Sequence, residues 1–227
     1  MKWKDGTLYE GEWFNDYPNG FGIMTFSTGE TYQGEWILGK ADGYGIFSGS
    51  GTEYIGEWKE DMKEGIGKET LLLSKDVYLG NFKNGQKNGI GVYEWGNGEK
   101  YEGFFDNNNM SGYGKFQSND GKIYEGNFLK NQKHGYGHLH CRDNSEYLGF
   151  YFYGNKNGLG KYKYANGNVF FGSWKDGKKD GIGKIVYSNN KIKYGIWENG
   201  NRKKWFNNEE LINLNDNEDY QKIKELK

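Results

Sequence analysis

Aromatic side chains recur along the chain at a fixed spacing, with glycine between them. A ring, a glycine and a second ring occupy positions i, i+2 and i+4, as in Tyr32, Gly34 and Trp36. Successive triplets start 22 to 24 residues apart. They start at Tyr9, Tyr32, Tyr54, Tyr78, Tyr101, Tyr124, Tyr147 and Phe170, and a degenerate ninth copy starts at Lys193. Repetition at this period indicates a repeat protein in which each unit contributes one supersecondary element.

Each repeat predicts a β-hairpin. The two rings and the glycine between them share one face of a strand, because side chains alternate sides with a period of two. A second strand with glycine and apolar residues at the same period follows a polar link of about six residues. Tighter Asn-Gly or Asp-Gly pairs, such as Asn97-Gly98, then lead into the next hairpin. Such pairs are typical of two-residue type I′ turns.

The glycines predict how so thin a sheet is held together. Glycine weakens a strand unless something large lies against its backbone. We therefore expect the rings of each hairpin to lie over glycines of its own and of the next hairpin. A single hairpin is marginally stable, and stacking supplies the missing burial. The sequence thus predicts an all-β fold, an elongated single-layer antiparallel sheet of about nine stacked hairpins over residues 1–206.

The repeat resembles a known family. The run Tyr9-Glu10-Gly11-Glu12-Trp13, followed by Gly20-Phe21-Gly22, is similar to the MORN (membrane occupation and recognition nexus) repeat, and the resemblance covers about residues 1–206. It implies a non-enzymatic scaffold that binds partners along its surface. Short MORN proteins hold myosin tails or organise cortical structures. The implied partner is therefore a helix or peptide of a cytoskeletal or membrane-associated protein.

The repeat stops at residue 207, and the tail predicts a short amphipathic helix over residues 207–227. Asn207 precedes two acidic residues, a pattern typical of a helix start. A second start at Asp216 or Asn217 places Tyr220, Ile223 and Leu226 along one side. This helix either caps the open last hairpin, since an exposed sheet edge invites aggregation, or docks on a second copy or another protein.

The face opposite the rings becomes apolar towards the C-terminal end. Early repeats carry polar residues there, such as Glu10 and Gln33. Later repeats carry Leu79, Phe104, Leu148, Phe150, Phe171 and Ile196. An extended apolar surface indicates burial by something else. We expect the tail helix, or a second copy in a homodimer, to cover it.

Composition agrees with a folded chain of unusual type. Hydrophobic residues make up only 34% and mean hydropathy is -1.00, values typical of disorder, but 18% of residues are aromatic and supply large apolar area. Apolar runs of about 20 residues, a signal peptide and a disulfide framework are all missing, which predicts a cytoplasmic protein. Charge is uneven: residues 1–66 carry -7 and residues 67–206 carry +9.

The sequence offers no candidate catalytic residues, metal site or cofactor site. The Gly-x-Gly motifs lack the strand-turn-helix setting of nucleotide loops. His138 and His140 share one face of a strand while Cys141 points to the other, so these residues and nearby His134 cannot converge on zinc. We expect no enzyme activity.

Two surfaces remain as candidate binding sites. The first is the ring face, on which the rings either satisfy one another or form a groove for a partner segment. Its predicted contact residues are Tyr32, Trp36, Tyr54, Trp58, Tyr78, Phe82, Tyr101, Phe105, Tyr124 and Phe128. The second is a basic ladder expected in the loops along one edge. Its members are Lys63, Lys87, Lys133, Lys156, Lys179, Arg202 and Lys203.

The basic ladder predicts an alternative function, the binding of anionic phospholipid headgroups, at about 1 kcal/mol per lysine near an anionic surface. Homodimerisation through the C-terminal half is a further alternative. Nucleic acid is not expected, because the chain carries a net charge of -1. We expect a location in the cytoplasm, at the cortical cytoskeleton or the inner face of the plasma membrane.

Overall fold

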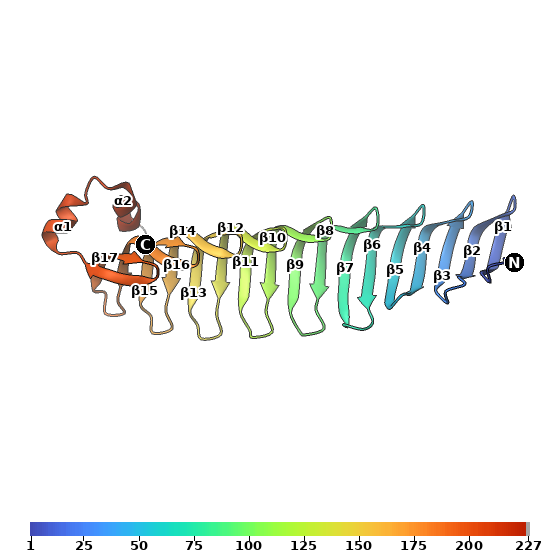
Figure 1. The fold of residues 1–227 in the computed structure, drawn as a ribbon, viewed down its shortest axis with the longest axis horizontal. Helices are drawn as coiled ribbons and strands as arrows, with labels where there is room; N and C mark the ends of the chain where they lie inside the picture. Colours follow the sequence, from blue (N-terminus) through green and yellow to red (C-terminus); the bar gives the residue numbers. More distant parts are fainter. Residues whose placement is uncertain (226–227) are drawn as a thin grey trace. The chain divides into compact units, whose positions relative to one another are not determined.

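The computed structural model describes residues 1–225, which form eighteen strands and two short helices (Figure 1). Every described strand pair is antiparallel, and consecutive strands form nine hairpins. The all-β class, the single-layer sheet and the short helical tail are confirmed. The chain divides into two compact units, the first unit, residues 1–111, and the second unit, residues 112–227. Within the described residues, no helix is long and apolar enough to span a bilayer.

The first unit is built from consecutive hairpins. Its strands are β1 (Leu8–Phe14), β2 (Tyr17–Thr25), β3 (Thr31–Ile37), β4 (Lys40–Gly49), β5 (Thr52–Lys59), β6 (Met62–Leu71), β7 (Asp76–Lys83), β8 (Gln86–Glu94) and β9 (Lys100–Asp106). Each of these strands pairs with the next in chain order.

The second unit repeats this plan and adds the helices. After β10 (Asn109–Gln117), which starts before the boundary, come β11 (Ile123–Leu129), β12 (Gln132–His140), β13 (Glu146–Phe152), β14 (Asn155–Lys163), β15 (Val169–Lys175), β16 (Lys178–Val186), β17 (Ile192–Glu198) and β18 (Asn201–Trp205). The helices are α1 (Asn208–Asn213) and α2 (Glu218–Glu225). The degenerate repeat at Lys193 still forms its hairpin, β17 and β18.

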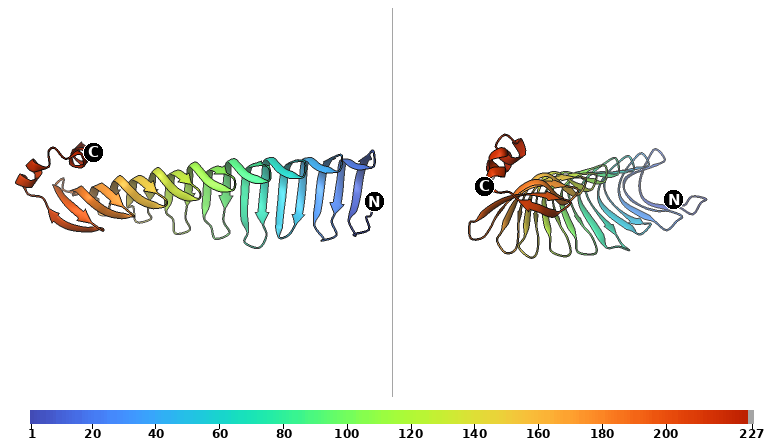
Figure 2. Two further views of the ribbon diagram at one scale, coloured as in Figure 1. Left: turned by 45° about the horizontal axis from the view of Figure 1, so that its top comes forward. Right: turned by 60° about the vertical axis from the view of Figure 1, so that its left-hand side comes forward.

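The register inside a hairpin is set by glycine facing glycine. In the second hairpin Gly34 pairs with Gly45, but the next pair is Trp36 with Ala41. One residue of β3 therefore opposes three of β4, a bulge that bends both strands. Gly43 lies in this bulge with φ of +106°, a conformation that glycine adopts without strain. The repeated bulge accounts for the curved hairpins in Figure 2.

The two kinds of turn are the reverse of the sequence prediction. The link inside each hairpin is a two-residue turn with both residues at positive φ, as at Glu60 and Asp61 (46° and 67°), which is the type I′ geometry. The return between hairpins is usually longer and has one positive-φ residue, as at Gly98 (89°); the exception is the return from β4 to β5, a two-residue turn with Ser50 and Gly51 at 49° and 72°. There Asn97 accepts a hydrogen bond from the Glu99 amide at 3.0 Å. Asn-Gly and Asp-Gly therefore serve a wider loop, because an Asx turn uses the side chain as well as the backbone.

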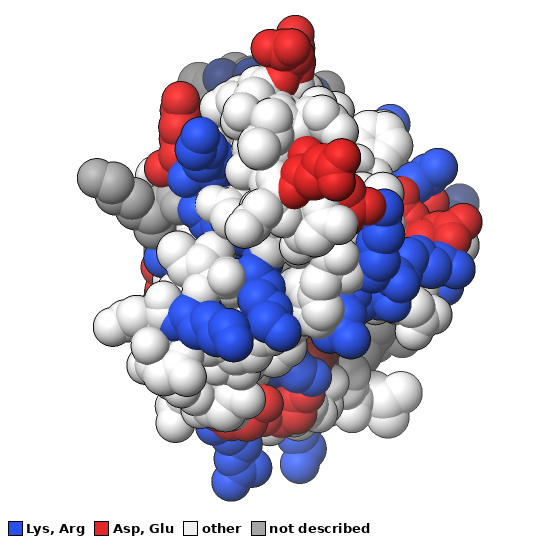
Figure 3. Space-filling view, turned by 90° about the vertical axis from the view of Figure 1, so that its left-hand side faces the viewer, with Lys and Arg blue, Asp and Glu red and all other residues white. Residues whose placement is uncertain are grey.

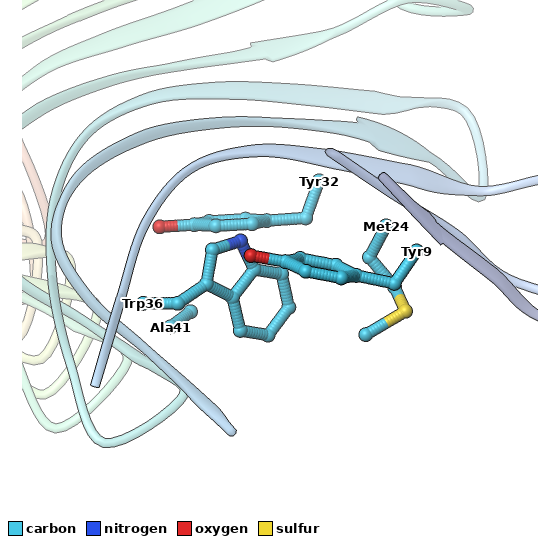
Figure 4. Packing of buried hydrophobic residues seen from close by; sticks show 5 residues of the cluster. All are labelled: Tyr9, Met24, Tyr32, Trp36 and Ala41. Carbon is cyan, nitrogen blue, oxygen red and sulfur yellow. The ribbon is translucent and has the colours of Figure 1, made fainter. Parts of the chain in front are cut away.

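The first ring of each repeat lies over two glycines of its own hairpin. A Cβ built on Gly22 would come within 2.2 Å of the Tyr9 hydroxyl oxygen, and one on Gly11 within 2.7 Å. The predicted contact with glycine is therefore confirmed for the ring's own hairpin. The next hairpin contributes its second ring instead: Trp36 lies between Tyr9 and Tyr32 (Figure 4).

The tail forms two helices, of which α2 packs on the sheet. Asn207 caps α1 through a reciprocal pair of hydrogen bonds with Glu210, as expected from the acidic first turn. Tyr220 and Ile223 of α2 are buried, and the Tyr220 ring lies 5.3 Å from that of Tyr194 on β17. Predicted Leu226 lies outside the described residues. The packed helix covers a face of the sheet, and its described contacts are with β16 and β17.

The apolar second face is covered only where α2 lies. Phe171 is 4% exposed, and Lys184 beside it donates a hydrogen bond to the Lys224 carbonyl at 3.1 Å. By contrast, Leu79, Phe104 and Phe150 are about half exposed. The expectation that the tail buries this face is right at Phe171 and wrong at these three positions, because a helix of 8 residues reaches too few strands.

Candidate functional site: the ring face and its lysine row

The rings of each unit form a continuous edge-to-face series. In the first unit Tyr32 meets Trp36 of its own strand at 4.9 Å and Trp58 of the next hairpin at 5.2 Å, with interplanar angles of 82° and 89°. In the second unit Tyr147 meets Tyr151 and Trp174 in the same way, at 5.3 and 5.2 Å. Edge-to-face contacts suit the quadrupoles of both rings. The series is thus the hydrophobic core of a sheet that has no second layer over most of its length.

The residues predicted to contact a partner are mostly this core. Nine of the ten are at most 5% exposed, and Trp58 is half-buried. They lie on one face, as predicted, but between hairpins they satisfy one another and present little surface. The alternation of ring and glycine predicts the face correctly. It cannot predict exposure, because the packing of the second ring onto the preceding hairpin is a tertiary contact.

Each buried tyrosine also ties down the bulge. The Tyr54 hydroxyl donates a hydrogen bond to the Glu57 carbonyl at 2.9 Å, and Tyr147 does the same with Phe150 at 3.1 Å. Burial raises the pKa of these phenols, and that of Tyr101 to about 12. They therefore remain protonated donors and are unsuited to acid-base chemistry near neutral pH.

The predicted basic ladder lies on the ring face, and its expected place along a loop edge is wrong. Lys87, Lys133, Lys156 and Lys179 are each the second residue of a strand, directly opposite a second ring. The two-residue turn causes this, since it places the second residue after the turn across from the ring that precedes it. We call Lys63, Lys87, Lys133, Lys156 and Lys179 the lysine row.

In the first unit a carboxylate of the protein itself neutralises the lysine row. Glu69 of β6 bridges Lys63 (2.5 Å) and Lys87, giving one oxygen to each. The Glu69 side chain is 12% exposed. Burial acts to raise its pKa, but the hydrogen bonds from the two lysines outweigh burial and lower it. Here the row is a satisfied ion-pair network.

In the second unit the lysine row has no such partner. Among the described residues, no carboxylate lies within ion-pairing distance of Lys133, Lys156 or Lys179. Their ammonium groups lie over rings instead: Lys133 is 5.0 Å from the centre of Tyr124, and Lys156 is 4.6 Å from that of Tyr147. Burial lowers the pKa of all three, and that of Lys156 to about 8. Cation–π contact compensates only part of the lost hydration.

Two hydrogen-bonding atoms beneath this part of the row are also unsatisfied. The Tyr151 hydroxyl and the indole Nε1 of Trp174 are buried and have no partner among the described residues. In the first unit the corresponding indoles of Trp36 and Trp58 donate to backbone carbonyls at 3.2 and 3.3 Å. Buried polar atoms without a hydrogen-bond partner are rare in folded proteins.

The last two members of the predicted ladder are exposed. The Arg202 guanidinium lies 4.3 Å from the Trp205 ring, and Lys203 pairs with Glu198 at 2.7 Å. Figure 3 views this end of the chain and shows basic side chains interspersed with acidic ones. Ion pairs this exposed contribute little to stability. These residues form a mixed surface distinct from the half-buried row.

The second unit also contains a cluster of possible metal ligands on the face opposite the rings. His138, His140 and Glu146 each offer one ligand atom, all within 4.8 Å of one another. Cys141 is not part of the cluster, as the sequence indicated. Glu146 is not recognisable from the histidine spacing, because it comes from the next strand, where it pairs directly with His140.

Nine hairpins, one per repeat, define a β-sheet repeat protein whose rings are its core. The family model for the MORN repeat matches residues 9–31, 32–52, 54–71, 78–100, 101–123, 124–146, 147–169 and 170–192. The chain therefore belongs to the MORN-repeat family. Membership in this family fits a protein-binding scaffold. No curated protein sequence matches the chain.

Solved structures that resemble the chain share little sequence with it. The SAS-4 (dCPAP) TCP domain of Drosophila melanogaster, in complex with a proline-rich motif of Ana2, is 10% identical, with a TM-score of 0.41 over 69% of this chain and 85% of that one. The TCP10 domain of Danio rerio CPAP is 11% identical, with a TM-score of 0.38 over 91% and 98%. Its E1021V mutant is 13% identical, with a TM-score of 0.33 over 91% and 97%.

Proposed function

We propose that this protein is a non-enzymatic scaffold whose second unit binds an acidic segment of a partner protein along the ring face. The observation that carries the proposal is the part of the lysine row that has no carboxylate partner within residues 1–225, in which Lys179 alone has a polar partner, the Tyr164 hydroxyl. Three half-buried ammonium groups, Lys133, Lys156 and Lys179, lie in register on successive hairpins without a carboxylate. A partner that supplies carboxylates would relieve the cost of their burial.

The first unit supplies an internal model of the bound state. Glu69 lies between two successive lysines of the row and contacts both. Glu69 lies opposite the first ring of its hairpin, Tyr54. In the second unit the equivalent residues are Leu139, opposite Tyr124, and Tyr162, opposite Tyr147, and neither carries a charge. A carboxylate from a partner would take the place that Glu69 takes in the first unit. Charge-assisted hydrogen bonds of this kind are stronger than neutral ones.

The spacing of the row restricts the partner's sequence. Successive lysines are two strands apart, which is about 9.6 Å at the usual strand separation. Seven residues of an α-helix rise about 10.5 Å, and three residues of a polyproline II helix, which make one full turn, rise about 9.3 Å. We therefore expect Asp or Glu at every seventh position of an α-helical partner, or at every third position of a partner in the polyproline II conformation.

The class of partner follows from the family resemblance. We place it among cytoskeletal or membrane-associated proteins, with a helix of the myosin-tail kind as the leading candidate. We place the complex in the cytoplasm, at the cortical cytoskeleton or the inner face of the plasma membrane. Anionic phospholipid is a weaker candidate for the row, because its ammonium groups lie half-buried against rings and a bilayer surface is flat.

The test is a binding titration with designed peptides. A helical peptide with Glu at every seventh position would be labelled and titrated with the protein by fluorescence anisotropy, beside a version with Gln at those positions. Binding should weaken at least about a thousandfold when Lys133, Lys156 and Lys179 are changed together to Gln, at roughly 1.5 kcal/mol or more per charged hydrogen bond lost. The matched control is Lys130→Gln, Lys175→Gln and Lys178→Gln, which removes the same charge from exposed positions.

Two further arms decide between interpretations. Glu69→Gln frees Lys63 and Lys87, and should create a second site for the acidic peptide in the first unit. Vesicles containing phosphatidylserine should not compete with the peptide. Equal loss of affinity in the two triple variants, or displacement of the peptide by vesicles alone, would refute the proposal.

A further inference from the structure

Two histidines and a glutamate form a compact ligand set on the face opposite the rings. The rings of His138 and His140, two residues apart on β12, are 3.8 Å apart between centres. Glu146 of β13 pairs with His140 in the strand register, and its Oε2 lies 3.2 Å from Nε2 of His138. Two ligands of a tetrahedral zinc ion lie about 3.3 Å apart, since each is about 2.0–2.1 Å from the metal. One of the required separations is therefore already present.

The backbone holds these ligands in place. Both strands continue through the cluster without a bulge, as the pairs of His138 with Leu148 and His140 with Glu146 show. All three side chains are half-buried, and their ligand atoms lie within 4.8 Å of one another. Small side-chain rotations would bring the three atoms to the separation that one metal ion requires. A preformed pair of strands lowers the entropic cost of binding.

The neighbouring charges suit a carboxylate that binds through one oxygen. Lys163 of β14 holds the other oxygen of Glu146, Oε1, at 3.2 Å. A hydrogen bond to the oxygen that does not bind the metal orients a carboxylate ligand. On β11, the other neighbour of β12, Glu125 lies opposite His138 in the strand register. Its carboxylate forms an ion pair with Lys115 at 2.9 Å.

We propose that His138, His140 and Glu146 bind one divalent transition-metal ion of the zinc class. Two imidazoles and one carboxylate are a donor set for zinc, nickel or copper, whereas calcium and magnesium prefer oxygen alone. Three protein ligands leave a fourth position for water or for a donor from another molecule. The site is independent of the lysine row, because the side chains of β12 that face Tyr124 and Tyr147 belong to the opposite face.

The test is calorimetric titration of the tag-free protein with zinc chloride. We expect one zinc ion per chain, and an affinity at least about tenfold weaker after His138→Gln, His140→Gln or Glu146→Gln. His134→Gln is the matched control: it removes a histidine from the same strand whose ring packs instead on Phe152 and Tyr153, at 5.4 and 5.1 Å. This control should bind zinc as the unmodified chain does.

A spectroscopic arm identifies the ligands directly. Zinc should shift the ring resonances of His138 and His140 in an NMR titration and leave those of His134 unchanged. The proposal is overturned if roughly 100 µM zinc gives no binding. It is also overturned if His134→Gln weakens binding as much as His138→Gln, or if Glu146→Gln leaves the affinity unchanged. Circular dichroism of each variant confirms that the strands are intact.

Discussion

The contact between Tyr32 and Gly45 gives the sharpest test of the packing. A methyl group at residue 45 would lie 2.3 Å from the Tyr32 hydroxyl oxygen and 2.4 Å from Cζ, where contact normally needs more than 3.4 Å. The ring would have to move by about 1 Å. It is 2% exposed and lies against both Trp36 and Trp58, so it has little freedom to move.

The expected cost of Gly45→Ala follows from three contributions. Overpacking of a core costs up to about 3 kcal/mol. Displacing the ring breaks the hydrogen bond from the Tyr32 hydroxyl to the Glu35 carbonyl, 3.2 Å long, which costs about 1 kcal/mol. Alanine restricts the unfolded chain and returns about 0.4–1 kcal/mol. We therefore expect a net loss of about 3 kcal/mol in the free energy of unfolding.

Hydrogen exchange of the β3–β4 hairpin, read by mass spectrometry, is the appropriate assay, because a repeat protein can lose one hairpin while the others persist. A double-mutant cycle with Tyr32→Leu supplies the control. The smaller side chain leaves room above residue 45, so the two changes should cost less together than separately, by more than about 1 kcal/mol. Strictly additive costs, or a loss below about 1 kcal/mol for Gly45→Ala alone, would refute the packing argument.

Two other predictions concern charge and the tail. Affinity for the acidic peptide should fall as pH rises above about 8, where Lys156 loses its proton, and Lys156→Gln should flatten this dependence, as measured by anisotropy. In the unfolded chain Lys156 keeps its proton up to a pH of about 10.5, so between pH 8 and 10.5 the unfolded chain binds more protons than the folded one. The contribution of Lys156 should therefore make the free energy of unfolding rise with pH in this range. Urea unfolding of the unmodified protein and of the Lys156→Gln variant would show the difference. Removal of residues 207–227 exposes Phe171 and should produce concentration-dependent self-association in light scattering, whereas Phe171→Ser in the same truncation should prevent it.

The sequence predicts the sheet well because its repeat is local. Tyr9, Gly11 and Trp13 recur with a period that only a strand can use, and Asn207 before two glutamates marks the helix start. Turn type is harder to predict. Asn97-Gly98 suits a two-residue turn by composition, yet its side-chain hydrogen bond supports a longer one.

The binding surface is harder still to predict from sequence. The bulge opposite Glu35 changes which residues of β4 face Trp36, so the position of the lysine row depends on a register that the spacing does not reveal. Glu69 and Glu146 gain partners across strands, Lys87 and His138, which lie 18 and 8 residues away in the sequence. Such contacts emerge only after the strands are paired.

The ring series also has a consequence for the length of the protein. Within the second unit, Tyr124 contacts a ring of its own strand and Tyr151 of the following hairpin, and Tyr147 contacts its own ring and Trp174. If residues 147–169 were deleted, Trp174 would take the place of Tyr151 beside Tyr124, and the edge-to-face series on this face would continue. Whole repeats can therefore be gained or lost as modules, and the number of successive lysines offered to a partner can change by one at each such step.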